Sequence, residues 1–188
     1  MNDLSTPSFS ADAPVPAKIT SAPVLVVDDD AAVRSTLRLF LKSEGLEAVL
    51  AATAEEALTQ LRQREFGLLL ADMNYGRDTT SGAEGLALIA AVRALDAQLP
   101  IVALTAYGSV ALAVEAMRAG AQDFIEKPWD NTRLASLIRA QLALRDSQHR
   151  SQRLAAQNTL LQDAAGSGAW IGSSAPMLAL MQQVAAVA

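Results

Sequence analysis

Short apolar runs alternate with amphipathic segments from residue 24 to residue 127. Apolar runs of four or five residues bounded by polar residues are typical of buried strands, and apolar residues three or four positions apart are typical of helices that pack by one face. These patterns predict five strands, at 24–27, 47–51, 67–71, 101–104 and 123–126. They also predict four intervening helices, at 31–44, 53–64, 82–95 and 109–119.

This regular alternation favours one fold class. Parallel strands need crossover connections, which are usually helical, and the helices then cover both faces of the sheet. We therefore expect an α/β fold with a doubly wound, five-stranded parallel sheet of the flavodoxin-like type. In such sheets ligands bind at the carboxyl ends of the strands, near the point where the strand order reverses.

A long helix is expected after the fifth strand, because no proline or glycine occurs between Pro128 and Gly166. It is expected to begin at Asp130 or Asn131 and to run to about residue 162. The seam of a possible heptad register is Leu137, Ala140, Leu144, Ser147, Ser151, Leu154, Asn158 and Leu161. This is a weak coiled-coil pattern, in which Asn158 could set the register. The helix either forms a homodimer through this seam, which is the interpretation we prefer, or lies with it against its own domain.

Composition divides the chain into four parts. Residues 1–22, rich in Ser, Thr, Pro and Ala, predict a flexible N-terminal extension. Residues 23–131 are expected to form the α/β domain, and residues 132–165 a helical linker. Residues 166–188 begin a new apolar segment and are interpreted as the start of a second, incomplete domain.

Acidic residues directly follow two of the expected strands. Asp28 and Asp29 follow the first strand, and Asp72 follows the third. Neighbouring parallel strands would bring these carboxylates into one crevice, where like charges repel each other unless a cation offsets them. The three carboxylates, together with the backbone carbonyl of Asn74, suit Mg²⁺ or Mn²⁺, because both ions prefer oxygen ligands.

Asp72 is the candidate nucleophile. An aspartate can accept a phosphoryl group as an acyl phosphate when a metal ion and a cationic side chain neutralise the phosphoryl oxygens. Lys127 ends the fifth strand and is the expected cation, since it is the only lysine in the last two-thirds of the chain. Thr105 ends the fourth strand, and its hydroxyl would donate to one phosphoryl oxygen.

The overall composition narrows the classes of function. The 188 residues include 20 acids and 15 bases, so a chain of net charge −5 is not expected to bind nucleic acid by itself. The absence of cysteine excludes disulfides and thiolate metal sites. No apolar run is long enough to cross a bilayer and no signal sequence is visible, so we expect a cytoplasmic protein without membrane contact.

Four short motifs lie in order at the ends of the expected strands. They are Val26-Val27-Asp28-Asp29-Asp30, Leu70-Ala71-Asp72-Met73-Asn74, Leu104-Thr105-Ala106 and Glu126-Lys127-Pro128. Together they strongly resemble the motifs of response-regulator receiver domains of two-component signalling, over about residues 22–145. The resemblance implies a CheY-like fold in which a partner sensor histidine kinase phosphorylates Asp72. It also implies a cis Lys127–Pro128 peptide, phosphate contacts from the backbone N–H groups of Met73 and Ala106, and Thr105 and Phe124 as a switch pair.

Other segments are similar to one subgroup of receivers. The loop at 75–84 is longer than is usual in receivers and lacks their Met-Pro pair, and residues 171–177 are similar to the entry into the AAA+ domain of NtrC-like, sigma-54-dependent activators. This similarity implies contacts with sigma-54 RNA polymerase and DNA only through domains that this chain does not contain. No Walker A motif occurs, so we expect no ATP hydrolysis and no enzyme activity beyond accepting a phosphoryl group.

Two other functions stay open on the sequence. A phosphatase similar to the haloacid dehalogenases also uses a strand-end aspartate and Mg²⁺, but it requires a second acid two residues later, where this chain has Asn74. The other is a flavodoxin-like interaction module with a degenerate site, which would act without phosphorylation. Binding of Mg²⁺ separates this module from a receiver.

Overall fold

The structure is a computed structural model that describes residues 22–74, 82–106 and 110–166. The strands are β1 (Val24–Val27), β2 (Ala48–Ala51), β3 (Leu68–Asp72), β4 (Ile101–Ala106) and β5 (Asp123–Lys127). The helices are α1 (Ala31–Ser43), α2 (Ala54–Gln63), α3 (Ala83–Leu95), α4 (Val110–Ala119) and α5 (Asn131–Gly166). The predicted N-terminal extension, most of the predicted long loop and the predicted second domain lie outside the described residues, apart from residue 22, the loop's last residues and Gly166.

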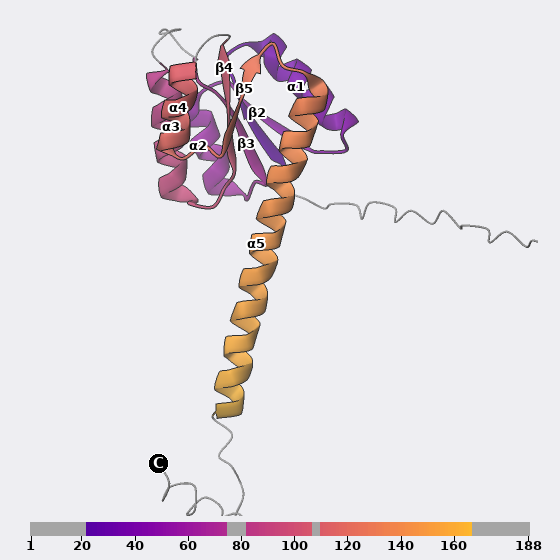
Figure 1. The fold of residues 1–188 in the computed structure, drawn as a ribbon, viewed down its shortest axis with the longest axis vertical. Coiled ribbons are helices and arrows are strands. Elements are labelled where there is room, and N and C mark those ends of the chain that lie inside the picture. Colours follow the sequence, from indigo (N-terminus) through magenta and orange to yellow (C-terminus); the bar gives the residue numbers. More distant parts are fainter. Residues whose placement is uncertain (1–21, 75–81, 107–109, 167–188) are drawn as a thin grey trace, which may run out of the picture. The chain divides into compact units, whose positions relative to one another are not determined.

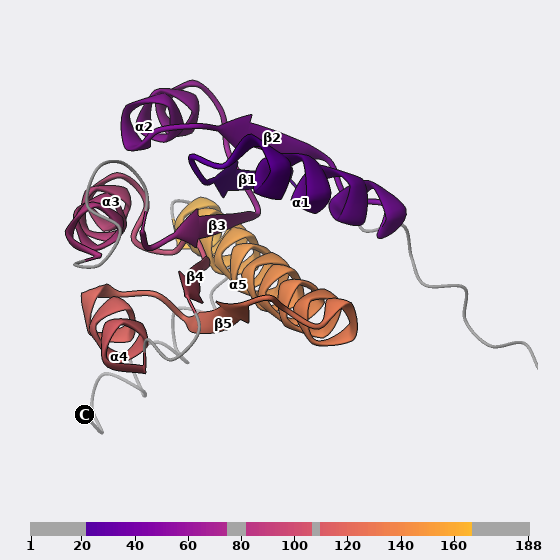
Figure 2. The same ribbon diagram turned by 90° about the horizontal axis from the view of Figure 1, so that it is seen from above.

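The five strands form one parallel sheet in the order β2-β1-β3-β4-β5. The chain moves from β1 to the β2 edge and then returns past β1 to β3, so the strand order reverses between β1 and β3. Helices α2, α3 and α4 cover one face of the sheet, and α1 and the first part of α5 cover the other (Figures 1 and 2). The prediction of a doubly wound, five-stranded parallel sheet is confirmed.

Each face of the sheet has its own apolar core, because successive side chains of a strand point to opposite faces. In β1, Leu25 and Val27 pack toward α2, α3 and α4, whereas Val24 and Val26 pack toward α1 and α5. All four side chains are fully buried. Both faces of a central parallel strand are therefore apolar, which explains why its sequence is a continuous apolar run rather than an alternating one.

Three strands continue beyond the ends predicted from the sequence. The ladder pairs Asp72 with Leu104, Thr105 with Glu126, and Ala106 with Lys127. The sequence patterns ended each strand at its last apolar residue, but ladder pairing uses backbone groups and does not require an apolar side chain. Asp72, Thr105 and Lys127 therefore belong to the strands, whereas Asp28 and Asp29 lie in the loop that follows β1.

Helix α5 is part of the domain over its first turns. Leu134, Ile138 and Leu142 are buried against the sheet, and the nearly buried Arg145 donates from Nη2 to Asp96 Oδ2 over 2.8 Å. The domain thus continues past the boundary predicted after residue 131, and two compact units meet between Arg145 and Asp146. The predicted long helix is confirmed, but Leu137 of its heptad seam packs against the domain.

None of the helices in the described part of the chain combines the length and apolarity that a membrane-spanning segment requires.

Candidate functional site

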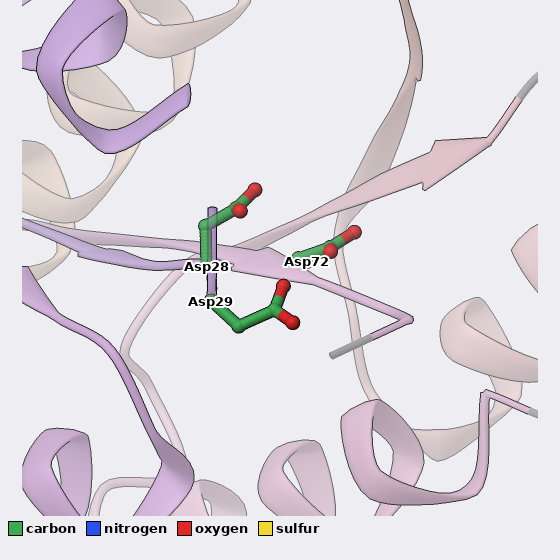
Figure 3. A group of neighbouring side chains, drawn as sticks. All are labelled: Asp28, Asp29 and Asp72. Carbon is green, nitrogen blue, oxygen red and sulfur yellow. The ribbon is translucent and has the colours of Figure 1, made fainter. Parts of the chain in front are cut away.

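Three carboxylates meet at the carboxyl ends of β1 and β3. The two strands are neighbours in a register that pairs Val27 with Ala71, so the residues that follow, Asp28 and Asp72, lie at the same level of the sheet. Asp29 comes next along the chain, and one carboxylate oxygen from each of the three acids lies within 4.8 Å of the others. The side chains of Asp29 and Asp72 extend toward the same region beyond the strand ends (Figure 3). The structure therefore brings together the acids that the sequence predicted to converge.

Lys127 reaches this cluster from the end of β5. Its Nζ donates to Asp28 Oδ2 over 2.6 Å and lies 3.1 Å from Asp72 Oδ1. The Asp28 side chain is fully buried, and its second oxygen, Oδ1, accepts the backbone N–H of Asp30 over 2.9 Å. One ammonium group thus offsets two carboxylates. The Lys127–Pro128 peptide bond is cis, as the resemblance implies.

The pKa values of Asp72 and Lys127 are shifted by burial and by the charges around them. Burial raises the pKa of Asp72, and the charge of Asp28 adds to this rise, while Lys127 and a hydrogen bond from the backbone N–H of Asn74 oppose it without cancelling it. For Lys127, burial alone would lower the pKa, but the hydrogen bonds and charges of Asp28 and Asp72 outweigh burial and raise it. Lys127 is therefore charged throughout the physiological range, and the Asp72 carboxylate is more basic than a free aspartate.

The donor set fits a divalent cation of the magnesium class. All three side chains offer carboxylate oxygens, which are hard ligands, and no histidine or cysteine belongs to this group in the described residues. Repulsion among the acids, which contributes to the raised pKa of Asp72, is the term that a bound cation would relieve. Asp28, Asp29 and Asp72 are therefore the residues that could hold such an ion.

The remaining predicted site residues lie around this cluster. Thr105 is fully buried in β4, and its hydroxyl has no hydrogen-bond partner among the described residues. Ala106 ends β4 and is exposed, and Phe124 in β5 is half-buried against the core under α2, α3 and α4. Thr105 follows directly after Leu104, the ladder partner of Asp72, so its side chain belongs to the same end of the sheet.

The structure corrects one prediction about the residues after Asp72. The backbone N–H of Met73 donates to the carbonyl of Leu104 over 2.9 Å, so it belongs to the ladder and is not available as a phosphate contact. The N–H of Asn74, one residue later, is the one that bonds the Asp72 carboxylate. Neighbouring N–H groups of a strand point in opposite directions, which explains the exchange of roles. The side-chain oxygen of Asn74 is buried without a hydrogen-bond partner among the described residues.

Helix α3 packs closely against the backbone of Met73, which directly follows Asp72. A Cβ atom on Gly85 would lie 2.7 Å from the Cα and 2.9 Å from the carbonyl oxygen of Met73, which are backbone atoms that cannot rotate away. Only glycine allows the first turn of α3 to approach this backbone so closely. The contact fixes the position of Met73, and with it the neighbouring Asp72.

A residue that the sequence patterns did not select also contacts the cluster. Arg34, in the second turn of α1, donates from Nη1 to the backbone carbonyl of Asp28 over 2.6 Å. The signal in the sequence was an arginine six residues after the first acid, close enough to reach back over the start of its own helix. Asp30 caps that helix, since its Oδ1 accepts the N–H of Ala32 over 2.7 Å.

A family model described as the response regulator receiver domain matches residues 24–139. Among curated proteins, the transcriptional regulatory protein ZraR of Salmonella typhimurium is 34% identical over 165 residues, which cover 88% of this chain and 34% of ZraR. The response regulator protein FleR of Pseudomonas aeruginosa is 39% identical over 118 residues, which cover 63% of this chain and 24% of FleR. The chain thus spans about a third of the length of ZraR and about a quarter of the length of FleR.

Solved structures give the same result. The receiver domain of NtrX from Brucella abortus is 34% identical with a TM-score of 0.58, over 64% of this chain and 98% of that chain. A longer structure of NtrX from Brucella abortus, in complex with ADP, is 29% identical with a TM-score of 0.64, over 88% of this chain and 34% of that chain. A CheY-like receiver domain protein from Methanospirillum hungatei is 29% identical with a TM-score of 0.62, over 69% of this chain and 99% of that chain.

Proposed function

The chain belongs to the response regulator receiver domain family, and we propose that Asp72 is the residue through which it accepts a phosphoryl group from a sensor histidine kinase. The observation that carries this proposal is the position of Lys127, whose Nζ lies 3.1 Å from Asp72 Oδ1 and 2.6 Å from Asp28 Oδ2, in a cluster that also includes Asp29. A carboxylate that contacts an ammonium group and belongs to a candidate cation site is suited to phosphoryl transfer, because both positive charges can stabilise the phosphoryl oxygens.

In the proposed step, one carboxylate oxygen of Asp72 attacks the phosphorus atom of a phosphohistidine on the kinase. The P–O bond to Asp72 forms as the P–N bond breaks, and the electron pair leaves with the donor imidazole. Asp72 must be ionised to attack, and burial raises its pKa, so Lys127 has a second role in limiting that rise.

Magnesium or manganese is the proposed cofactor, held by Asp28, Asp29 and Asp72 together with the backbone carbonyl of Asn74. A bound ion of this kind supplies charge neutralisation for the transferring phosphoryl group. The proximity of the three carboxylates supports this ligand set. It also argues against an interaction module with a degenerate site, which would have no need to gather like charges.

The proposed switch uses Thr105 and Phe124. The Thr105 hydroxyl is buried without a partner among the described residues, so a phosphoryl oxygen on Asp72 would give it an acceptor. The backbone N–H of Ala106 is proposed as a further phosphate contact. Movement of Thr105 toward the phosphate would leave space that Phe124, half-buried in the neighbouring strand, can fill. A local change of charge is thereby converted into a change of packing.

Incubation with Mg²⁺ and acetyl phosphate, followed by intact mass measurement, tests the acceptor. The wild-type chain is expected to gain one phosphoryl mass, and the Asp72→Asn variant none. Asp146→Asn, which removes an exposed acid of α5, is the matched control and should be labelled like the wild type. Equal labelling of Asp72→Asn and wild type would reject Asp72 as the acceptor.

We also propose a homodimer through the later part of α5, in a parent protein of the NtrC-like, sigma-54-dependent class. Leu154 and Leu161, two seam positions of the heptad register, are 55% and 66% exposed, as expected of apolar residues that await a partner. The similarity to ZraR and FleR supports the class of the parent. Sedimentation should give a dimer for the whole chain and a monomer for a fragment ending at Leu144, and a monomer in both cases would exclude the helix as the interface.

A further inference from the structure

Arg34 connects helix α1 to the loop of residues 28–30, which contains two of the candidate metal ligands. Its Nη1 donates to the carbonyl oxygen of Asp28 over 2.6 Å. That carbonyl belongs to the peptide unit between Asp28 and Asp29, so the hydrogen bond fixes the plane from which the backbone of Asp29 continues. We propose that Arg34 is a positioning residue for the divalent cation, which orients Asp29 for coordination without touching the ion. The inference rests on the proposed function, because it assumes the same metal site.

The other contacts of the loop show why the hydrogen bond from Arg34 to the Asp28 carbonyl matters. The Asp28 side chain is held on both oxygens, by Lys127 and by the N–H of Asp30, and its N–H donates to Ala51 over 3.3 Å. Asp29 is the exposed member of the three candidate ligands. The direction in which its side chain leaves the loop is set by the peptide that precedes it. The Asp28 carbonyl is the backbone group just before Asp29, and Arg34 holds it.

Two contacts hold Arg34 in place. Its own backbone N–H donates to the carbonyl of Asp30 over 3.0 Å, which is the first hydrogen bond of α1, and its side chain is half-buried. The residue is thus tied to the loop at both ends, through its backbone to Asp30 and through its guanidinium to Asp28. Removing a group that hydrogen-bonds to a metal ligand from outside the coordination sphere typically lowers metal affinity by about 10- to 100-fold.

Two physical effects of Arg34 on a cation have opposite signs. Its positive charge repels a divalent ion, so removing the charge alone would tighten binding. Its hydrogen bond orients Asp29, so removing the bond would weaken binding. The guanidinium is half-buried at the surface, where solvent screens its charge, whereas the hydrogen bond is short and acts directly on the peptide between two ligands. We therefore expect the loss of the hydrogen bond to prevail.

The test compares Arg34→Met with Arg38→Met in the full chain. Arg38 is exposed one helical turn further along α1, so its replacement removes the same charge without removing a bond to the loop. Free Mn²⁺ is counted by its electron paramagnetic resonance signal during titration, and Mg²⁺ affinity is measured by competition. Circular dichroism at the temperature of the titration confirms that each variant is folded.

Arg34→Met is expected to bind Mn²⁺ roughly tenfold more weakly than wild type, and Arg38→Met to bind it as wild type does. Binding by Arg34→Met that equals or exceeds that of Arg38→Met would overturn the inference, because only the charge would then matter. If Arg34→Met does not fold, Arg34→Lys is the second variant, because it keeps the charge and a donor group on a shorter side chain. It should show a smaller loss, and unchanged affinity would again overturn the inference. A wild-type chain that binds no Mn²⁺ would instead reject the metal site of the proposed function.

Discussion

Replacing Lys127 by methionine removes the only ammonium group that the described residues place against Asp28 and Asp72. The lysine Nζ lies 2.6 Å from Asp28 Oδ2 and 3.1 Å from Asp72 Oδ1, and the Asp28 side chain has no exposed surface. Removing one partner of a buried ion pair leaves an uncompensated charge, which typically costs about 3 kcal/mol or more. For a domain of this size, we expect a Tm roughly 10 °C below that of the wild type near neutral pH.

The penalty should depend on pH, and its sign follows from the pKa of Asp72. Burial raises this pKa and Lys127 opposes the rise, so the pKa of Asp72 rises further when the lysine is lost. A carboxyl group whose pKa is raised in the folded state destabilises that state at high pH, and the destabilisation disappears as the pH falls through the folded-state pKa. The difference in Tm between wild type and Lys127→Met should therefore be larger at about pH 7.5 than at about pH 5.

Thermal unfolding followed by circular dichroism, in buffer with a chelator, measures both quantities. Lys42→Met is the control, because Lys42 is exposed in the last turn of α1 and its loss should change stability only slightly. Adding Mg²⁺ should restore more stability to Lys127→Met than to wild type, since the cation can replace the missing charge. A Tm equal to that of the wild type, or a penalty that does not change with pH, would refute the reasoning.

Three further substitutions probe separate parts of the domain. Thr105→Val removes a buried hydroxyl that has no partner among the described residues, so chemical denaturation should show a stability gain of about 1 kcal/mol. A loss of stability would indicate a hidden partner. Gly85→Ala places a Cβ 2.7 Å from Met73 Cα, and chemical denaturation should show a loss of stability of about 2 kcal/mol together with slower labelling by acetyl phosphate. Unchanged stability and labelling would mean that α3 can shift freely. Leu142→Ala should cost about 3 kcal/mol, because Leu142 is buried in the core beneath α5, and a cost near zero would place that turn of α5 outside the folded unit.

The sequence predicted most of the fold because the strand and helix patterns of this chain do not overlap. The apolar runs of β1 and β3 contain no polar residue to suggest a helix, and Gly120 directly follows α4 with a positive φ of 118°, a conformation that favours glycine. The convergence of Asp28, Asp72 and Lys127 also followed from the sequence, because the parallel topology places all strand ends at one edge. Neither prediction depends on the detailed position of any side chain.

The parts that sequence reasoning missed depend on single peptide orientations and on the choice of a helix face. Whether Met73 or Asn74 presents its N–H to Asp72 depends on which N–H the ladder with β4 uses, and no pattern of residue types reveals that. The first turns of α5 carried two apolar patterns at once. The heptad seam that starts at Leu137 was recognised, whereas the stripe of Leu134, Ile138 and Leu142, which fills the core, was not.

That stripe determines where this domain can be joined to another protein. Because Leu134, Ile138 and Leu142 are as much a part of the core as the strands they cover, a chimera spliced just after β5 would expose a row of aliphatic side chains on the sheet and should aggregate. A junction after Arg145 keeps the row covered and allows the foreign helix to continue in phase. The helical phase of a fused segment should therefore be set relative to Arg145 and not relative to the end of β5.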